Sequence, residues 1–290
     1  MSRMPELPEV QTIVSDLKRK LKGHVITKIW TDWPKSFFSF LPQIKKSIIG
    51  KKIIGVRRRA KNILIDFAGG KTMLIHLKMT GHLLYRDKAW RKKVTRNHPF
   101  HDSYNQYIRT VFYLDKSKEL AFSDLRRFGE IMLFDTRREN ELKRLKSLGP
   151  EPLDPQFDFS RFQKLASKKK GRVKSVLLNQ SFISGIGNIY ADEILWEAKI
   201  HPKTKMELLS RKQQTDLFRA IKKILKAAVK HRGTSVSDYR DAGGKKGGYQ
   251  KIIKVYQRKD EPCYRCHTLI KKIKVNNRGT NFCPHCQKEK

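Results

Sequence analysis

Four cysteines near the end of the chain constrain its fold most strongly. They form two Cys-x2-Cys pairs, Cys263 with Cys266 and Cys283 with Cys286, separated by 16 residues. Two short chelating turns on successive hairpins bring four thiolates within tetrahedral reach, the geometry that zinc prefers. Free thiols or a disulfide pair are the alternatives, although a protein in a reducing compartment has little use for disulfides. Because four cysteines leave no open position for water, we expect one structural Zn²⁺ ion.

The charge of the chain indicates a polyanionic partner. Its 290 residues carry 65 Lys and Arg against 27 Asp and Glu, a formal net charge of +38. Such an excess attracts polyanions and destabilises the compact protein by self-repulsion, so nucleic acid is the favoured partner and a membrane surface the minor alternative. No apolar run approaches the ~20 residues of a spanning helix, and the N-terminus lacks the long apolar core of a secretory signal. We therefore expect a soluble, intracellular protein that does not engage membranes.

Residue patterning changes at a proline-rich linker, residues 148–158, which contains three prolines. Before the linker, residues 9–21 carry one apolar stripe at helical spacing. Short β-type runs separated by Gly, Pro and charged turns then extend over residues 25–135, as expected for an antiparallel sandwich or barrel. After the linker the pattern is helical. Helices are expected at residues 172–180, 189–199 and 210–230.

Six specific motifs occur in a fixed order along the chain. They are MPELPEV at 4–10, RRAKNILI at 58–65, HLKMTG at 76–81, DLRRFG at 124–129, LGPEPL at 148–153 and SGIGNIYADEIL at 184–195. With the four-cysteine finger, the chain resembles the formamidopyrimidine-DNA glycosylase family over essentially its whole length. Members of this family are bacterial base-excision enzymes for oxidised purines. Relatives that act mainly on oxidised pyrimidines typically begin Pro-Glu-Gly-Pro-Glu, so Leu7 favours the purine branch.

The pattern and the resemblance together predict an α+β fold. An N-terminal β-sandwich flanked by helices would precede a helix–two-turn–helix domain with a β-hairpin zinc finger. The predicted boundaries are 4–147 for the catalytic sandwich domain, 148–158 for the linker, 159–250 for the helix–two-turn–helix domain and 251–290 for the zinc finger. The resemblance implies a monomer that binds damaged double-stranded DNA in the bacterial cytoplasm, associated with the nucleoid.

The resemblance implies that Pro5 is the nucleophile. A proline at a free N-terminus carries a secondary amine, which can attack the anomeric carbon of a damaged nucleotide and form an iminium. An α-amino group titrates near ~8, so a usable neutral fraction exists at cellular pH. Glu6 looks like the general acid/base that assists sugar opening, and Glu9 like a supporting carboxylate. The alternative is that Pro5 and Pro8 only start a helix while Glu6 and Glu9 cap its dipole.

The residues before Pro5 depart from the family pattern. Met1, Ser2 and Arg3 precede Met4, whereas in the family the initiator methionine is removed from in front of the proline. While they remain attached, the Pro5 nitrogen is an amide and cannot form an iminium. We expect translation to start at Met4, or the extension to be removed. A retained extension would favour a non-catalytic lesion-binding or DNA-binding protein.

Other matching residues are implied to contact DNA. Met79, Arg126 and Phe128 would fill the gap left by an everted nucleotide, because Met and Phe wedge into a base stack and Arg can hydrogen-bond the orphaned cytosine. Met79 or Phe128 alone could equally be a core residue. Lys61 belongs to the implied catalytic residues and stands at a family phosphate-binding position.

Asn188 and Arg278 match the family's remaining phosphate-binding positions. The glycines of the SGIGN turn before Asn188 permit close backbone approach, and the helix N-terminus that follows favours phosphate. Lys174 matches a family lysine that takes part in processing the oxidised purine, and it joins the implied catalytic residues. The alternative is that Lys174 is a solvated surface lysine without a catalytic role.

We also make predictions for two further segments, residues 234–249 and 87–106. Residues 234–249 look like the family segment that closes over the everted base, because their glycines allow two conformations. Residues 87–106 are longer and more basic than the family leads us to expect. We predict a surface loop near DNA for residues 87–106.

Overall fold

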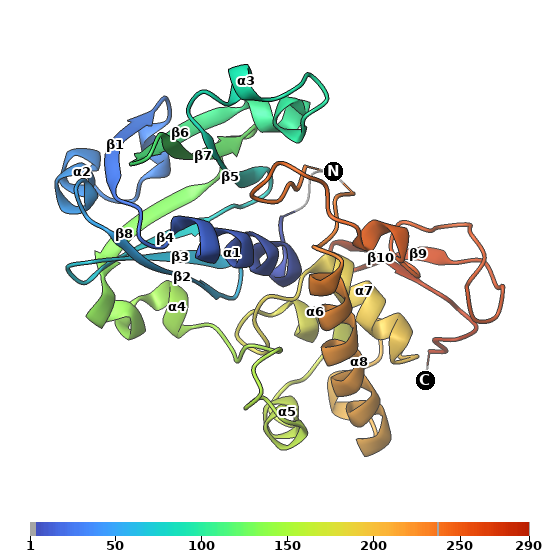
Figure 1. Cartoon of the computed structure of the whole chain (residues 1–290). Coiled ribbons are helices and arrows are strands. Elements are labelled where there is room, and N and C mark those ends of the chain that lie inside the picture. Colours follow the sequence, from blue (N-terminus) through green and yellow to red (C-terminus); the bar gives the residue numbers. More distant parts are fainter. Residues whose placement is uncertain (1–3, 237, 290) are drawn as a thin grey trace. The chain divides into compact units, whose positions relative to one another are not determined.

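The structure, a computed structural model, describes residues 4–236 and 238–289. The chain forms two compact units, and Figure 1 labels their elements. The N-terminal unit contains the residues up to Lys146 together with His231–Gln250. The C-terminal unit contains Ser147–Lys230 together with the residues from Lys251 onward. The segment His231–Gln250, which we assigned to the helical domain, thus packs with the N-terminal unit. The predicted domain boundaries otherwise stay a prediction.

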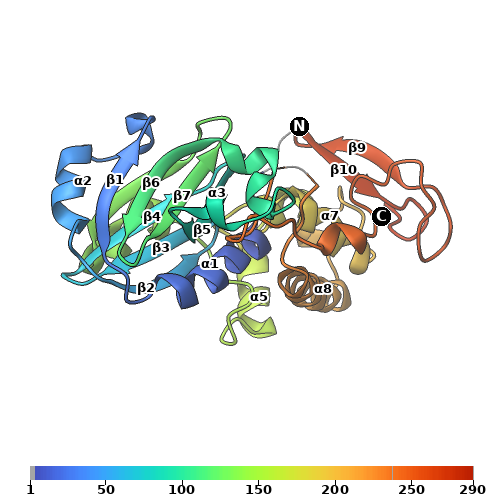
Figure 2. The same ribbon diagram turned by 45° about the horizontal axis from the view of Figure 1, so that its top comes forward.

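Two four-stranded antiparallel sheets form the centre of the N-terminal unit (Figure 2). The first sheet has the order β1 (Ile26–Thr31), β6 (Ile108–Leu114), β7 (Lys118–Asp124) and β5 (Gly81–Asp87). The second has the order β2 (Ile53–Arg59), β3 (Asn62–Phe67), β4 (Lys71–His76) and β8 (Glu130–Asp135). The helices of this unit are α1 (Leu7–Leu21), α2 (Leu41–Ile48), α3 (Trp90–Lys93) and α4 (Lys143–Lys146).

The core of the N-terminal unit lies between the two sheets. One face of α1, including Val10, Ile13 and Leu17, is buried against strand residues such as Ile63 and Phe112. Burial of this apolar area is the main favourable contribution to folding, at about 25 cal/mol per Å². The predicted sandwich flanked by helices is therefore confirmed.

The β-type runs on which the expectation for residues 25–135 was based do not include β5 or β7. In β7 every residue from Glu119 to Asp124 is buried, so the alternation of buried and exposed positions that reveals a strand is absent. The reason is a second apolar cluster, in which Trp90 and Phe100 cover Leu84 and Ala121 on the other face of the same sheet. The segment 87–106 is therefore packed against the sheet through Trp90 and Phe100. Most of the segment, including Arg91, Lys92 and Lys93, is nevertheless exposed as expected, although it contains α3 and is not a loop throughout. Its expected position near DNA stays a prediction.

Helices and one hairpin form the C-terminal unit. They are α5 (Phe159–Ala166), α6 (Val173–Leu178), α7 (Asn188–Glu197), α8 (Arg211–Lys230) and the strands β9 (Lys271–Val275) and β10 (Arg278–Phe282). In α7 all residues from Ile189 to Trp196 are buried. Its Glu193 carboxylate accepts hydrogen bonds of 2.9 Å from the backbone N–H groups of Lys254, Val255 and Tyr256. Burial nevertheless raises the pKa of Glu193. These bonds tie α7 to the segment that leads into the zinc-binding hairpin.

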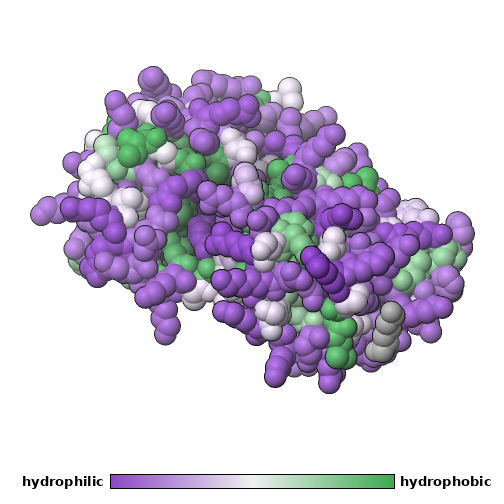
Figure 3. All heavy atoms as spheres, turned by 90° about the horizontal axis from the view of Figure 1, so that it is seen from below, coloured by the Kyte–Doolittle hydropathy of each residue, from purple (hydrophilic) through white to green (hydrophobic). Residues whose placement is uncertain are grey.

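The surface is rich in polar side chains, and hydrophilic residues dominate the face shown in Figure 3. Within the described part of the chain, no helix combines the length and the apolar character that crossing a membrane requires.

Candidate active site and nucleic-acid interface

The start of α1 holds the predicted nucleophile and its carboxylates. Pro5, Glu6 and Glu9 are buried, with Glu6 4% and Glu9 2% exposed. The backbone N–H of Glu6 donates to Oε2 of Glu9 at 2.9 Å, half of a capping box between these residues. Such a box fixes the two side chains at the helix N-terminus. The capping role that we weighed as an alternative is thus present, and it holds both carboxylates beside Pro5. The expected removal of Met1–Arg3 concerns residues outside the described part.

The second oxygen of Glu9 contacts the segment after α8. Its Oε1 accepts a hydrogen bond from the backbone N–H of Thr234 at 2.6 Å. The hydroxyl of Tyr239 donates to the Glu9 carbonyl oxygen at 3.4 Å. A side chain at Gly233 would meet Oε1 of Glu9 at 2.7 Å, so only glycine fits there. Gly233, Thr234 and Tyr239 therefore border Glu9, the predicted supporting carboxylate.

Met79, Arg126 and Phe128 lie together at the ends of their strands. The guanidinium of Arg126 is 3.5 Å from Sδ of Met79 and 4.7 Å from the ring centroid of Phe128. Phe128 is 48% exposed, so it is not a core residue. An aromatic ring, a thioether and a guanidinium at one exposed tip are suited to occupying a gap in a base stack.

A single carboxylate connects the two turns that carry this tip. Asp124, which ends β7, accepts hydrogen bonds from the Thr80 hydroxyl and from the backbone N–H groups of Arg126 (3.2 Å) and Gly129 (2.7 Å). A Cβ at Gly129 would lie 2.2 Å from the ring of Phe122. The DLRRFG and HLKMTG motifs are therefore joined through Asp124 and Thr80.

Lys61 occupies the turn between β2 and β3 and is half-buried. Its charge acts on His76, which ends β4. Burial, with the charges of Arg144, Lys78 and Lys61, lowers the pKa of His76 to about 3. His76 is therefore neutral, and its Nδ1 accepts from the backbone N–H of Lys78 at 3.0 Å, which leaves the proton on Nε2. The sequence analysis did not predict His76 as a site residue, although it begins the HLKMTG motif.

In the C-terminal unit, Asn188 contacts the hairpin that carries Arg278, the second candidate phosphate-binding residue. Asn188 is the first residue of α7, and its Nδ2 donates to the Gly279 carbonyl at 3.0 Å. The neighbouring Arg278 begins β10 and is exposed. A helix N-terminus with an adjacent arginine is a favourable site for an anion.

Lys174, in α6, also contacts this hairpin and is fully buried. Its Nζ donates to the same Gly279 carbonyl at 3.1 Å and to the Thr280 hydroxyl at 2.7 Å, and it lies 2.6 Å from the carboxylate of Asp192. These contacts anchor the hairpin to α6 and α7. A fully enclosed ammonium argues against direct contact with a lesion and against a solvated surface lysine. Its implied part in lesion processing stays a prediction.

The four cysteines form a metal site. Their sulfur atoms all lie within 4.8 Å of one another, at 3.4 Å for Cys266–Cys283 and 4.0 Å for Cys263–Cys286. These distances exceed the ~2.05 Å of a disulfide. They suit thiolates that surround one Zn²⁺ at ~2.3 Å. One structural zinc is therefore confirmed.

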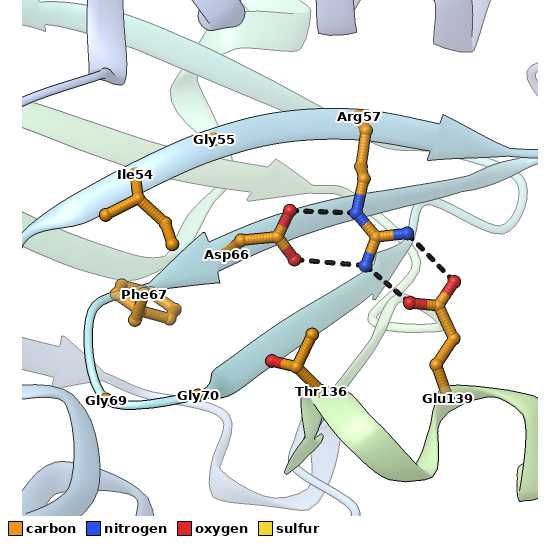
Figure 4. A pocket seen from close by; sticks show the side chains of 9 residues that line it. All are labelled: Ile54, Gly55, Arg57, Asp66, Phe67, Gly69, Gly70, Thr136 and Glu139. Atoms are coloured by element: carbon orange, nitrogen blue, oxygen red, sulfur yellow. Dashed lines mark hydrogen bonds and ion pairs between the residues drawn. The ribbon is translucent and has the colours of Figure 1, made fainter.

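A concavity of about 500 Å³ lies apart from these residues. Figure 4 shows the Arg57 guanidinium between the carboxylates of Asp66 and Glu139, with Ile54 and Phe67 at the other side. Arg57 donates to Asp66 at 2.8 and 3.1 Å and to Glu139 at 2.8 and 2.5 Å. The two carboxylates engage Arg57 fully, and none of the predicted site residues lines this concavity.

Comparison with known proteins identifies the chain. Three family models match: the formamidopyrimidine-DNA glycosylase N-terminal domain at residues 4–131, the H2TH domain of that glycosylase at 148–240, and a zinc finger found in FPG and IleRS at 260–288. The fold and the site thus define a DNA glycosylase of base-excision repair. The chain belongs to the formamidopyrimidine-DNA glycosylase family, of which apurinic/apyrimidinic lyase activity is also a property.

Full-length relatives support the assignment. The formamidopyrimidine-DNA glycosylase of Desulforamulus reducens is 40% identical over 292 residues, covering 99% of this chain and all of the relative. That of Pelotomaculum thermopropionicum is 39% identical over 288 residues, with 99% and 100% covered. Among solved structures, the Lactococcus lactis Fpg with DNA that contains an abasic site has a TM-score of 0.87 at 32% identity, covering 98% of this chain and 100% of that one. A complex of the same protein with FAPY-dG DNA gives 0.86 at 32% identity, with the same shares of both chains covered.

Proposed function

We propose that this protein excises oxidised purines, 8-oxoguanine and formamidopyrimidines, from duplex DNA and then cleaves the abasic strand by β,δ-elimination. The observation that carries the proposal is the position of Glu6. It is buried directly after Pro5 at the start of α1, beside a second buried carboxylate, Glu9. A nucleophile with adjacent carboxylates is the arrangement that covalent catalysis at a sugar carbon needs.

The chemistry would begin once Pro5 is the N-terminal residue. Its secondary amine attacks C1′ of the damaged nucleotide, the base leaves, and an iminium forms. Glu6 transfers the protons that sugar opening and the eliminations require. Glu9 keeps Glu6 in place through the capping box at the start of α1.

Recognition of the duplex would use residues of both units. The tip formed by Met79, Arg126 and Phe128 fills the gap after the nucleotide is everted, with Arg126 bonded to the orphaned cytosine. Lys61, Asn188 and Arg278 bind phosphates. The net charge of +38 supports strong attraction to DNA, and we propose a monomer associated with the bacterial nucleoid.

A second substrate class is oxidised pyrimidines. The Lactococcus lactis protein is known in a complex with DNA that contains an oxidised pyrimidine, at a TM-score of 0.86 and 33% identity to this chain. Leu7 favours the purine lesions as the main substrates. A non-catalytic DNA-binding protein is the remaining alternative if residues before Pro5 persist.

Borohydride trapping tests the proposal. Protein that starts at Met1 and protein that starts at Pro5 are each incubated with an 8-oxoguanine:cytosine duplex and borohydride, and the intact mass of the adduct is measured. We expect an adduct only when Pro5 is N-terminal, because only then is its nitrogen an amine. A matched duplex with an oxidised pyrimidine ranks the two lesion classes.

Two results would contradict the proposal. An adduct on protein that retains Met1–Arg3 would mean that another amine attacks, with Lys61 the first to replace. Tight binding without any adduct, from either form, would favour the non-catalytic protein.

A further inference from the structure

The segment Tyr239–Gly248 is held in place by contacts that neither the sequence nor the family assignment indicates. Asp241 organises its turn: the Asp241 carboxylate accepts from the backbone N–H groups of Gly243 (2.9 Å) and Lys245 (3.0 Å). The backbone N–H of Gly244 donates to the Asp241 carbonyl at 2.9 Å. These bonds make residues 241–245 a closed, self-supporting turn. We call it the 241–245 turn.

The 241–245 turn and its flank are docked on the N-terminal unit. Tyr239 and Ala242 belong to the main core cluster, and the backbone N–H of Tyr85 in β5 donates to the Ala242 carbonyl at 3.0 Å. Arg232 bonds Asp241 and also Asp16 of α1. In this structure the 241–245 part of the glycine-rich segment is packed, and our expectation that the segment allows two conformations stays a prediction.

Two residues of the basic 87–106 segment complete the docking. The guanidinium of Arg240, 2% exposed, donates to both carboxylate oxygens of Asp102 at 3.0 and 2.9 Å. The Nδ2 of Asn105 donates to the Gly244 carbonyl at 3.1 Å. A Cβ at Gly244 would lie 2.7 Å from the Asn105 amide nitrogen, so the close contact requires glycine there, at φ +79°.

These two residues are themselves rigidly placed. Asn105 is fully buried, and its Oδ1 lies 2.8 Å from Nε2 of His82 while its Nδ2 also donates to the Pro99 carbonyl at 2.7 Å. Asp102 sits two residues after Phe100, which packs on the sheet beside Trp90. The 87–106 segment is thus a fixed support on which the 241–245 turn rests.

We propose that Asp102 and Asn105 are positioning residues for base excision, acting through the 241–245 turn. Upstream of this turn, the backbone N–H of Thr234 bonds Glu9, the supporting carboxylate that holds Glu6 in the capping box. Releasing the turn therefore frees a segment that borders the site where an everted base would lie. The inference rests on the proposed glycosylase function. An abasic site presents no base to that segment. Strand cleavage at abasic DNA therefore does not need the contacts of Asp102 and Asn105 with the 241–245 turn.

Asp102→Asn and Asn105→Ala test the proposal in protein that starts at Pro5. The single-turnover rate of 8-oxoguanine removal is compared with the rate of cleavage of a preformed abasic duplex. We expect base removal to fall roughly tenfold to a hundredfold, as small misplacements of reacting groups do, and abasic cleavage to stay unchanged. Hydrogen exchange at Gly243–Lys245 should accelerate in the same variants.

Glu119→Gln is the matched control. It breaks a comparably buried ion pair, Arg86 Nε to Glu119 Oε1 at 2.6 Å, beside the same segment but away from the turn. We expect it to leave the ratio of the two rates unchanged. The exchanged pair Asp102→Arg with Arg240→Asp should restore base removal, because it re-forms the ion pair with the charges reversed.

A parallel loss of both rates in Asp102→Asn and Asn105→Ala would overturn the proposal in favour of a purely structural role. Unchanged base removal with accelerated exchange would overturn it as well, since the turn would then be released without consequence. Failure of the proposed function is distinct from both outcomes: the unmodified protein itself would then remove no 8-oxoguanine.

Discussion

The ammonium of Lys174 lies 2.6 Å from the carboxylate of Asp192, and both side chains are fully buried. Burial raises the pKa of Asp192, while the charge of Lys174 and hydrogen bonds from Asn281 lower it. A buried charge that loses its partner is costly. Lys174 also donates to the Gly279 carbonyl, as does Asn188 of α7. The pair therefore fixes the hairpin that carries Arg278 and Gly279 to α7.

Lys174→Met should lower the free energy of unfolding of the C-terminal unit by about 3–5 kcal/mol, because it leaves the Asp192 carboxylate buried without its ammonium. Urea unfolding measures the change. The control is Lys212→Met, which removes an exposed i,i+4 pair with Asp216 and should cost no more than about 0.5 kcal/mol. Lys174→Met protein that stays as stable as the parent but loses base excision would instead support the catalytic role.

Removal of zinc should unfold the hairpin and weaken DNA binding, because four thiolates that repel one another then lose their counter-charge. We expect one zinc per chain by elemental analysis, released when the thiols are titrated with a mercurial. Cys283→Ser should reduce the zinc content and the DNA affinity together. Full affinity in a zinc-free Cys283→Ser protein would refute a structural role for the metal.

Acid should destabilise the N-terminal unit through two histidines with lowered pKa values, the buried His82 and the half-buried His76. Burial is the first cause that lowers the pKa of His76 to about 3 and that of His82 to about 4. The unfolded chain binds these protons near pH 6.5, so it holds more protons than the folded chain below that pH, and stability falls as pH drops from 6.5 toward 4. At pH 5 each histidine should cost about 2 kcal/mol.

His82→Gln isolates one of these contributions. A glutamine can still donate to Asn105 but does not titrate, so unfolding free energies measured at pH 7 and pH 5 should differ by about 2 kcal/mol less than in the parent. An identical pH dependence in both proteins would mean that other groups cause the acid sensitivity.

Phe128→Ala and Arg126→Ala should impair excision without affecting stability. Both side chains are exposed, so the free energy of unfolding should change by less than about 0.5 kcal/mol. Arg126→Ala should also reduce the preference for cytosine opposite the lesion by about 1–3 kcal/mol. Rates on duplexes with each opposing base measure this. Leu125→Ala, on the same exposed turn, is the control, and an equal loss there would dismiss the gap-filling role.

Replacing Arg91, Lys92 and Lys93 with alanine should flatten the salt dependence of DNA binding. Each lost phosphate contact reduces the slope of log affinity against log salt by about 0.9. Lys93 also forms an ion pair with Asp87 at 3.0 Å, so that carboxylate competes with DNA phosphates for its ammonium. Binding isotherms between low and physiological salt measure the slope. An unchanged slope would place α3 away from the duplex.

Much of the candidate site could be predicted from local patterns. The spacing of Cys263, Cys266, Cys283 and Cys286 was sufficient for the zinc site, because metal geometry depends on short turns. The apolar stripe after Pro8 predicted α1, since helical periodicity is local. The pairing of Met79 with Arg126 and Phe128 came from motifs, and the structure adds Asp124 as the group that joins their turns.

Other features were decided only by the tertiary structure, because they depend on residues far apart in the chain. Asp102 meets Arg240 across 138 positions, and Thr234 meets Glu9 across 225. No local pattern marks either partner, so the sequence did not predict the contacts that hold the glycine-rich segment in this structure. Strand β7 was missed for the same reason, since Trp90 and Phe100 bury its outer face. Sequence alone determined the helices α1, α6, α7 and α8, the zinc ligands and the family, while burial and long-range hydrogen bonds decided which polar residues are locked in place.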